Sequence, residues 1–348
     1  MSEGNNRLPT AIAAAGLGIA AGMLAAKRFR RSYDLRGKTV LITGGSRGLG
    51  LVLARAFADQ GTRIVICARD REELIRAKQD LEHRGAEVYD YGLDMRNRGE
   101  VNALLDYVRS SVGPVDVLVN NAGVIQVGPL ELQTQQDFED AMAIHFWAPF
   151  YAMQAVLPDM RRRREGRIVN IASIGAKIPV PHLAPYCASK FALAGLSSAM
   201  GVELAKDNIY VTTVNPGLMR TGSHINAYFK GQNEAEFALF SLSAALPLTS
   251  IRAERAAHQI IAATKRGDAE LIITVQAKLA AMAHALAPEF TTDVLALVNR
   301  LLPGKGGIGT GMATGLESTS SVAPSFLTML NDNASYRNNE LKPNEQIH

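Results

Sequence analysis

From residue 38 onward, short runs of aliphatic and β-branched residues alternate with stretches that have helical periodicity. The first run, 38–45, reads KTVLITGG, and the stretch 48–61 after it has apolar residues at helical spacing before Gly61. Six further runs continue the strand series, at 62–69, 86–94, 115–123, 166–174, 209–217 and 269–275. Strands and helices that alternate in this way predict an α/β fold, in which helices cover both faces of one parallel sheet.

The two ends of the chain depart from this pattern. Residues 10–26 carry no charge and precede a basic run, so a membrane anchor that holds the main domain on the cytoplasmic side is favoured. A cleaved signal peptide and an alanine-rich helix of a cytoplasmic protein are the alternatives. The predicted organisation is an apolar segment 1–33, an α/β domain 34–275, apolar helices 276–303 and a Gly-, Ser- and Asn-rich flexible tail 304–348.

The function of the apolar stretches within 276–302 is open at this point. They suit a cap on the sheet, a dimer contact or a membrane surface, and packing onto the fold is favoured. The glycines at 304–311 resemble a phosphate-binding loop, but no strand precedes them and no helix follows them, which indicates a linker.

Composition narrows the class of protein. The chain has 348 residues, of which 47% are hydrophobic, enough for one large core with an extension. Its net charge of +4 resides largely in the runs 27–31 and 161–164, which is not the distributed basic surface of a nucleic-acid-binding protein. Cys67 and Cys187 have neither metal-ligand spacing nor a disulfide framework, which suits a reducing compartment. We therefore expect no nucleic-acid partner and no metal.

A glycine-rich sequence, TGGSRGLG at 43–50, stands where the first predicted strand turns into the first helix. Glycines at such a turn let the backbone approach a pyrophosphate, and the start of the helix supplies N–H groups and a favourable dipole. The binding residues expected in this loop are Gly44, Ser46, Arg47, Gly48, Leu49 and Gly50.

The end of the second predicted strand distinguishes the two forms of a nicotinamide dinucleotide. A carboxylate there would bind the ribose 2′-hydroxyl of NAD, but the chain has Arg69, and Arg47 is a second cation nearby. Two guanidinium groups favour a 2′-phosphate, and hence NADP(H). NAD(H) is the alternative, because a shifted loop would bring the Asp70 carboxylate into the site.

The sequence APYCASKFAL, at 184–193, places Tyr186 and Lys190 one turn apart on a predicted helix. A nearby cation favours the phenolate and lowers the pKa of a tyrosine from its ordinary value of about 10. Tyr186 is therefore a candidate proton donor and acceptor near neutral pH.

Three further motifs fall at the ends of predicted strands: NNAG at 120–123, Ser173, and NPG at 215–217. Together with the glycine-rich turn and the Tyr-x-x-x-Lys pair, they resemble the short-chain dehydrogenase/reductase family over about residues 36–275. The resemblance implies a single Rossmann-like, doubly wound parallel sheet of about seven strands, with an N-terminal apolar segment and a C-terminal helical extension.

The resemblance also implies roles for individual residues. Tyr186 would be the general acid and base, Lys190 would lower its pKa and hold the nicotinamide ribose, and Ser173 would hydrogen-bond the substrate oxygen. The remaining cofactor contacts would come from Asp94 at the adenine, from Asn121, Ala122 and Gly123 at the adenine ribose, and from Pro216, Gly217 and Thr221 at the nicotinamide.

One position departs from the family. Where many members have an asparagine that kinks a helix and relays protons, this chain has His145. An imidazole that relays protons and a packed core histidine are the two interpretations.

The implied activity is hydride transfer between a dinucleotide and an alcohol or carbonyl compound. Residues 218–247, which close over substrate in the family, are apolar with few charges, and this favours a hydrophobic alcohol and its ketone or aldehyde. A 3-oxoacyl-type reductase and a non-catalytic, cofactor-binding regulatory or scaffold protein are the alternatives. The resemblance alone implies a homo-oligomer.

Overall fold

The computed structural model describes residues 32–246, 249–343 and 345. The chain divides into two units, Met1–Asp34 and Leu35–His348, and the second contains nearly all the described residues. The apolar segment 10–26, for which we predicted a membrane anchor, lies outside the described residues. Within the described ranges, no helix combines the length and apolar character needed to cross a membrane.

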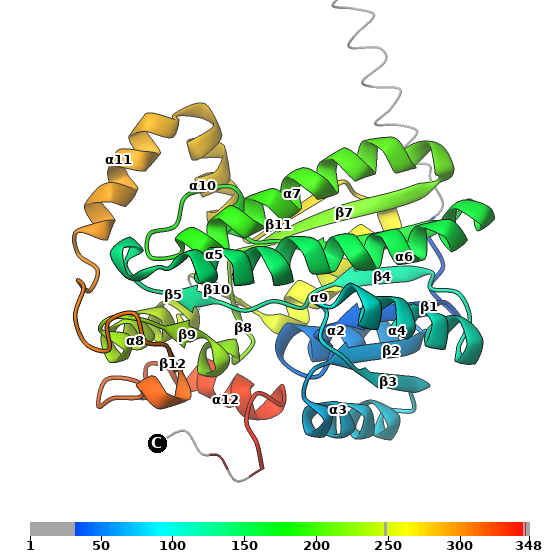
Figure 1. Ribbon diagram of the computed structural model, residues 1–348, viewed down its shortest axis with the longest axis horizontal. Helices are drawn as coiled ribbons and strands as arrows, with labels where there is room; N and C mark the ends of the chain where they lie inside the picture. Colours follow the sequence, from blue (N-terminus) through cyan, green and yellow to red (C-terminus); the bar gives the residue numbers. More distant parts are fainter. Residues whose placement is uncertain (1–31, 247–248, 344, 346–348) are drawn as a thin grey trace, which may run out of the picture. The chain divides into compact units, whose positions relative to one another are not determined.

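A seven-stranded parallel sheet forms the centre of the second unit (Figure 1). In spatial order its strands are β11 (Glu270–Ile273), β7 (Ile209–Pro216), β6 (Gly166–Ile171), β4 (Val117–Asn120), β1 (Thr39–Thr43), β2 (Arg63–Ala68) and β3 (Val88–Gly92). All seven predicted strands are present, and the α/β prediction is confirmed. The strand order reverses between β1 and β4, the place where such sheets bind ligands outside the carboxyl ends of their strands.

Helices cover both faces of the sheet (Figure 1). One face is covered by α4 (Arg98–Ser111), α6 (Ala148–Arg163) and α7 (Ala184–Leu204), and the other by α2 (Gly48–Ala58), α3 (Arg71–His83) and α9 (Ala253–Arg266). The core between the sheet and the helices α4 and α6 consists of aliphatic side chains such as Leu41, Leu104, Val156 and Ile168. Burial on both faces explains why the central strands read as continuous apolar runs.

A further layer lies beyond the carboxyl ends of the strands. It contains α8 (Asn233–Ala245) and two small sheets. One pairs β8 (Leu218–Arg220) with β10 (Ser250–Arg252), and the other places β9 (Tyr228–Phe229) between β5 (Gln126–Val127) and β12 (Ala313–Thr314). Phe229 and Phe237 are buried in the apolar cluster of this layer.

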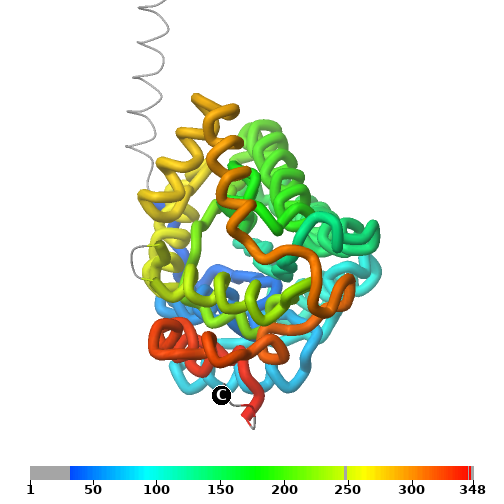
Figure 2. The backbone as a smooth tube through the Cα atoms, turned by 90° about the vertical axis from the view of Figure 1, so that its left-hand side faces the viewer, coloured from blue at the N-terminus to red at the C-terminus, as the bar shows by residue number. Residues whose placement is uncertain are grey.

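The helices that follow β11 differ from the expectation that they pack onto the fold. α10 (Val275–Leu286) and α11 (Pro288–Asn299) form a hairpin that stands away from the sheet (Figure 2). Ala277 is the one buried residue of the two helices, and Leu286 is 82% exposed. Their apolar side chains therefore contribute little to the core of this chain.

The C-terminal segment also differs from the flexible tail that its composition suggested. Residues 313–341 include β12 and the helix α12 (Met329–Arg337), and Ala334, Ser335 and Leu341 are buried. Many of the contacts in this segment come from asparagine side chains, which explains why a segment with few large apolar residues is nevertheless packed.

Candidate active site

The glycine-rich turn between β1 and α2 is held in place by the end of β4. The side-chain amide of Asn121 donates to the carbonyl oxygens of Thr43 (3.1 Å) and Gly44 (3.0 Å). The Thr43 hydroxyl accepts from the backbone N–H groups of Asn121 and Ala122, each at 3.0 Å. Gly44 has a φ of +63°, and a Cβ there would lie 2.9 Å from the Cα of Ala122. Asn121 and Ala122, predicted as ribose contacts, thus also fix the shape of the turn.

The start of α2 fits the phosphates of a dinucleotide. No side chain caps this helix, and its first turn contains no acidic residue. Its first N–H groups and its dipole therefore favour an anionic ligand. Gly50 lets the helix approach the Gly44 carbonyl closely, and Gly48 has a φ of +54°. The Gly48 N–H donates to the Asn338 carbonyl of the C-terminal segment at 2.9 Å.

The residues expected to distinguish NADP from NAD lie beside this turn. Asp70, which kept NAD as an alternative, caps α3 by accepting from the Glu73 N–H at 3.0 Å. Arg69 is exposed, whereas the Arg47 guanidinium donates to Glu73 at 2.9 Å. Asp94, expected at the adenine, binds the Arg96 guanidinium at 2.6 Å, and this hydrogen bond lowers the pKa of the Asp94 carboxyl group.

Ser173, Tyr186, Lys190 and His145 come together near the carboxyl ends of β4 and β6. Ser173 follows β6, Tyr186 and Lys190 lie on α7, and His145 lies in the π-helical turn Ala143–Trp147 between α5 (Gln135–Met142) and α6. The rings of His145 and Tyr186 meet edge to face with centroids 5.3 Å apart, and Lys190 Nζ is 5.5 Å from the Tyr186 centroid.

Gly123 lies against the same residues. A Cβ at Gly123 would lie 2.9 Å from His145 Nε2 and 3.7 Å from Lys190 Nζ. The NNAG motif therefore borders the catalytic residues as well as the glycine-rich turn.

The electrostatics of Tyr186 differ from the expectation. Burial raises the pKa of Tyr186 to about 12, and a hydrogen bond with the Ser173 side chain opposes this shift. Burial also lowers the pKa of Lys190 to about 7, and its ammonium group donates to the Ile171 carbonyl at 2.9 Å. Burial is thus the largest influence on the pKa of both groups, and it raises the pKa of Tyr186, whereas the spacing to Lys190 had predicted a lowering.

Both ring nitrogens of His145 are engaged. Nε2 accepts from the Val124 N–H at 3.2 Å, and Nδ1 donates to the Ser189 hydroxyl at 2.8 Å, which in turn donates to the Tyr186 carbonyl at 2.9 Å. Burial, followed by the charge of Lys190, lowers the pKa of His145 well below 6.5. The imidazole is therefore neutral with a fixed tautomer, and the geometry favours the packed core histidine over the proton relay.

The residues predicted at the nicotinamide end lie after β7. β7 ends at Pro216, and the backbone of Gly217 packs against Thr274, whose Oγ1 would lie 3.3 Å from an added Cβ. Thr221 is buried, its hydroxyl bonds Ser223 at 2.9 Å, and its carbonyl accepts from the Asn338 side chain at 2.9 Å. Asn338 therefore contacts both the glycine-rich turn and the loop after β7.

Sequence reasoning missed a buried polar chain beneath the catalytic helix. Asn120 donates to Asn170 at 2.8 Å, and Asn170 donates to Ser197 at 3.0 Å. Thr213 also donates to Ser197, at 2.7 Å. These bonds attach α7, which carries Tyr186, to strands β4, β6 and β7. Polar residues within otherwise apolar strands were the available signal.

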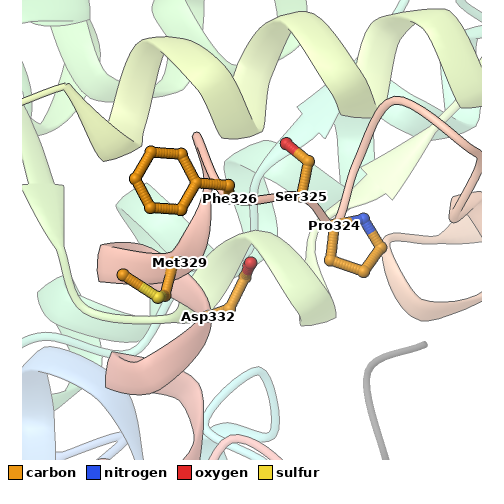
Figure 3. A pocket seen from close by; sticks show the side chains of 5 residues that line it. All are labelled: Pro324, Ser325, Phe326, Met329 and Asp332. Atoms are coloured by element: carbon orange, nitrogen blue, oxygen red, sulfur yellow. The ribbon is translucent and has the colours of Figure 1, made fainter.

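A surface pocket in the C-terminal segment lies outside this site (Figure 3). It is lined by Pro324, Ser325, Phe326, Met329 and Asp332. None of these is a predicted site residue, and Phe326 is 83% exposed. The pocket therefore belongs to the outer surface of the C-terminal segment.

Comparisons of the sequence with known proteins agree with this geometry. Residues 38–229 match a family model described as short chain dehydrogenase. The chain is 37% identical over 207 residues to the dehydrogenase/reductase SDR family protein 7-like of Anopheles gambiae, covering 58% of this chain and 65% of that protein. It is 33% identical over 189 residues to the 5-keto-D-gluconate 5-reductase of Escherichia coli, covering 54% and 74% of the two chains. It is 34% identical over 196 residues to the 17-beta-hydroxysteroid dehydrogenase 13 of Mus musculus, covering 56% of this chain and 64% of that protein. The matches to the mosquito and mouse proteins thus span slightly less than two thirds of those proteins.

Solved structures show the same fold. L-sorbose reductase of Gluconobacter frateurii, solved with NADPH and L-sorbose, aligns with a TM-score of 0.62 and 27% identity, over 70% of this chain and 97% of that one. Actinorhodin polyketide ketoreductase, solved as a variant with NADPH, aligns with a TM-score of 0.61 and 31% identity, over 69% and 97% of the two chains.

Proposed function

Because the chain belongs to the short-chain dehydrogenase/reductase family and is an NAD(P)-dependent oxidoreductase acting on CH–OH groups, we propose that it interconverts an apolar alcohol and its ketone or aldehyde with NADP(H). The observation that carries this proposal is that Lys177 and His182, in the loop between Ser173 and Tyr186, are each paired with a glutamate. The reaction class follows from the family, whereas the proposed substrate polarity and dinucleotide form are supported by this chain's own residues.

In the proposed reaction, the Tyr186 hydroxyl gives a proton to the carbonyl oxygen of the substrate, or takes one from the alcohol. Its hydrogen bond with Ser173 brings two hydroxyl groups to one place, where both can contact the same substrate oxygen. Lys190 stabilises the phenolate that remains when the proton has left. The dinucleotide, when bound, supplies or accepts the hydride.

The polarity of the substrate is inferred from residues 173–186. Lys177 and His182 in this loop are both paired, Lys177 with Glu270 at 2.6 Å and His182 with Glu236 at 2.6 Å. The partly exposed side chains Ile174, Ile178, Val180 and Leu183 are apolar. A loop with these side chains offers few polar groups that could bind a carboxylate or a phosphate of a substrate. It suits an apolar carbonyl compound.

The apolar residues of 218–247 support this inference less than their composition suggested. Phe229 and Phe237 are buried against each other, with ring centroids 5.6 Å apart. Their apolar character therefore serves the packing of the layer over the sheet, rather than contact with a substrate.

The preference for NADP(H) rests on Arg47, Arg69 and Asp70. We infer that Arg47 and Arg69 would contact a 2′-phosphate, since Arg69 is exposed and Asp70 is engaged as the cap of α3. We expect Arg69→Ala to weaken NADPH binding about tenfold and to change NADH binding little, because one charge-assisted hydrogen bond to the phosphate is lost. Equal effects on the two dinucleotides would contradict the proposed preference.

The test of the substrate class is NADPH oxidation with a series of ketones and aldehydes of increasing apolar size. The matched probes are 5-keto-D-gluconate and L-sorbose, which are polar carbonyl compounds. We expect kcat/KM to rise with apolar size and to be at least about a hundredfold lower for the two polar compounds. Preferential turnover of the polar compounds would overturn the proposed substrate class and leave the family assignment intact.

A second candidate is a reductase of 3-oxoacyl groups bound to a carrier. The similarity to actinorhodin polyketide ketoreductase, at 31% identity, favours it. Comparing a free 3-keto ester with the same acyl group on a carrier thioester separates the candidates. A strong preference for the thioester would favour the second candidate.

Two proposals concern the environment of the protein. We propose that residues 10–26, uncharged and followed by the basic run 27–31, attach it to the cytoplasmic face of a membrane. We also propose that it forms a homo-oligomer. Membrane fractionation of the full chain against a chain that starts at residue 34, followed by light scattering, tests both. Equal solubility of the two chains would contradict the anchor, and a monomeric mass would contradict the oligomer.

A further inference from the structure

The C-terminal segment engages the part of the glycine-rich turn that would face the phosphates of the dinucleotide. The first N–H of α2, on Gly48, donates to the Asn338 carbonyl at 2.9 Å. A side chain at Gly48 would collide with the Glu340 carboxylate, which among the described residues outside this turn and helix is the group within 4 Å of that position. In dinucleotide-binding turns the second glycine is the one that lets the backbone approach the pyrophosphate. In this structure it is the Glu340 carboxylate that lies close to Gly48.

The same carboxylate interacts with the cation expected at the 2′-phosphate. Arg47 Nε lies 3.5 Å from Glu340 Oε2, while Arg47 Nη1 binds Glu73 at 2.9 Å. Glu340 is only 5% exposed, and its Oε2 accepts a second hydrogen bond from Asn226 at 2.7 Å. The Arg47 guanidinium and the first N–H of α2 are donors of the kind that a phosphate group uses, and here they face Glu340 and the Asn338 carbonyl.

The neighbours of Glu340 fasten the segment on both sides of the site. The Asn339 side chain donates to the Ser46 carbonyl at 2.8 Å and accepts from Arg76 at 2.7 Å. The Asn338 side chain donates to the Thr221 carbonyl at 2.9 Å and accepts from Arg55 at 3.2 Å. Residues 338–340 therefore connect the glycine-rich turn with the loop at the predicted nicotinamide end.

We propose that Asn338, Asn339 and Glu340 form an intramolecular ligand of the dinucleotide's phosphate site, so that the affinity for NADP(H) is set by competition with the protein's own C-terminal segment. The proposal rests on the dinucleotide-dependent function proposed above. A carboxylate and a pyrophosphate repel each other and need the same donors, so the two do not share the site. The apparent dissociation constant is the intrinsic constant divided by the fraction of molecules whose segment has left the site.

The segment is held in a way that permits release. Asn338 and Asn339 hold it to the two loops by side-chain hydrogen bonds, each of which water replaces when the segment leaves. Burial raises the pKa of Glu340 to about 7, so the ionised carboxylate is partly disfavoured where it lies. A dinucleotide, with more negative charge and more acceptor atoms, has the advantage for the same donors.

The test compares Glu340→Gln with the matched variant Glu345→Gln. Both substitutions remove one negative charge from the same segment, but Glu345 accepts from the Lys342 N–H and has no bond to the glycine-rich turn. NADPH binding is measured by the quenching or enhancement of its fluorescence, without substrate. At about pH 8 Glu340→Gln removes the cost of a buried ionised carboxylate and should hold the segment more firmly. We expect it to raise the dissociation constant about fivefold, and Glu345→Gln to leave it within about twofold.

A second measurement uses the unaltered chain. Hydrogen exchange of the segment 329–342 should become faster when NADPH is added, while exchange at the glycine-rich turn 44–50 becomes slower. Slower exchange of 338–340 with NADPH would overturn the proposal, since the segment would then close over the dinucleotide rather than leave. Equal NADPH binding by the two glutamine variants would overturn it as well. If neither the unaltered chain nor Glu340→Gln binds any dinucleotide, the proposed function fails together with this inference.

Discussion

The two ends of the candidate dinucleotide site differ in what their polar groups contact. At the catalytic end, Ser173 and Tyr186 bond each other, and Lys190 donates to the adjacent Ile171 carbonyl. At the phosphate end, Gly48 and Arg47 contact Asn338 and Glu340 of the C-terminal segment. The proposed catalytic residues are thus assembled by the sheet and its helices, whereas the proposed phosphate donors contact a segment from the far end of the chain.

This difference separates two properties of a dinucleotide-dependent enzyme, its turnover and its affinity for the dinucleotide. Changes at the catalytic end should alter turnover without altering dinucleotide affinity. Changes in the C-terminal segment should alter dinucleotide affinity without altering turnover. Variants that violate this separation would show that the two ends act as one unit.

The largest effect is expected from Tyr186→Phe, which removes the hydroxyl that moves the proton. We expect kcat to fall about a thousandfold, with the dissociation constant of NADPH within about twofold, because the ring and its packing remain. Tyr89→Phe is the matched control, since Tyr89 lies on β3 and its hydroxyl donates to Glu87, away from the proposed catalytic residues. A Tyr186→Phe enzyme that keeps its turnover would assign the proton transfer to another group.

Lys190→Met should lower kcat about a hundredfold and at the same time stabilise the folded state near neutral pH. Burial lowers the pKa of Lys190 from 10.5 to about 7. Below pH 7 the native chain carries the full cost of a buried ammonium. Between pH 7 and 10.5 the unfolded chain binds more protons than the native one, so the stability of the unaltered protein rises with pH.

The gain in unfolding free energy from Lys190→Met should therefore be about 1–3 kcal/mol at about pH 6.5 and should shrink toward pH 10. Urea denaturation at the two pH values measures it. Lys265→Met is the control, because Lys265 lies on α9 and bonds Gln60 outside the site. A loss of stability at about pH 6.5 would show that Lys190 is favourably paired in the folded protein.

The catalytic end was largely predictable from the sequence because its residues lie at fixed positions relative to strand ends and helix turns. Ser173 follows a predicted strand, and Tyr186 and Lys190 share one helix face. The central strands were predictable from continuous apolar runs, since a parallel sheet covered on both faces requires them. The direction of the Tyr186 pKa shift was not predictable, because it depends on burial in the assembled structure rather than on the spacing to Lys190.

The phosphate end was predictable only in part. The glycine positions and Arg47 follow from local sequence, but Ser46 and its partner Asn339 are 293 positions apart. Asparagines in a segment poor in apolar residues gave no periodic pattern, and the same composition is typical of a flexible tail. Side-chain hydrogen bonds to distant backbone groups leave no mark in local sequence, so the role of residues 338–340 required the structure.

At the phosphate end we expect a smaller effect, a change in how the stability of the fold depends on pH. Glu340 faces Arg47, Asn226 and Glu73, and burial raises its pKa from 4.5 to about 7. Between pH 4.5 and about pH 7 the native chain binds more protons than the unfolded chain, so the free energy of unfolding falls as the pH rises. Above pH 7 it stays at this lower value. Glu340→Gln should therefore stabilise the fold by about 1 kcal/mol at about pH 8 and by less at about pH 5.

Thermal or urea unfolding of Glu340→Gln and Glu345→Gln at both pH values checks this. The Glu345→Gln variant should follow the unaltered protein at each pH. If Glu340→Gln were less stable at about pH 8, the ionised carboxylate would be a net stabilising partner of Arg47, and the segment would be held more tightly than we propose.

The smallest effect is expected from His145→Asn, at the catalytic end. The imidazole is neutral, because burial and Lys190 lower its pKa well below 6.5, and both of its nitrogens are bonded to Val124 and Ser189. An asparagine at this place, as many family members have, can keep one acceptor and one donor. We expect kcat within about threefold and an unchanged pH profile above about pH 6, since no titration is removed there. A shifted profile would instead place His145 in the transfer of protons, and would extend the group of linked residues at the catalytic end from Ser173 and Tyr186 to the helix turn between α5 and α6.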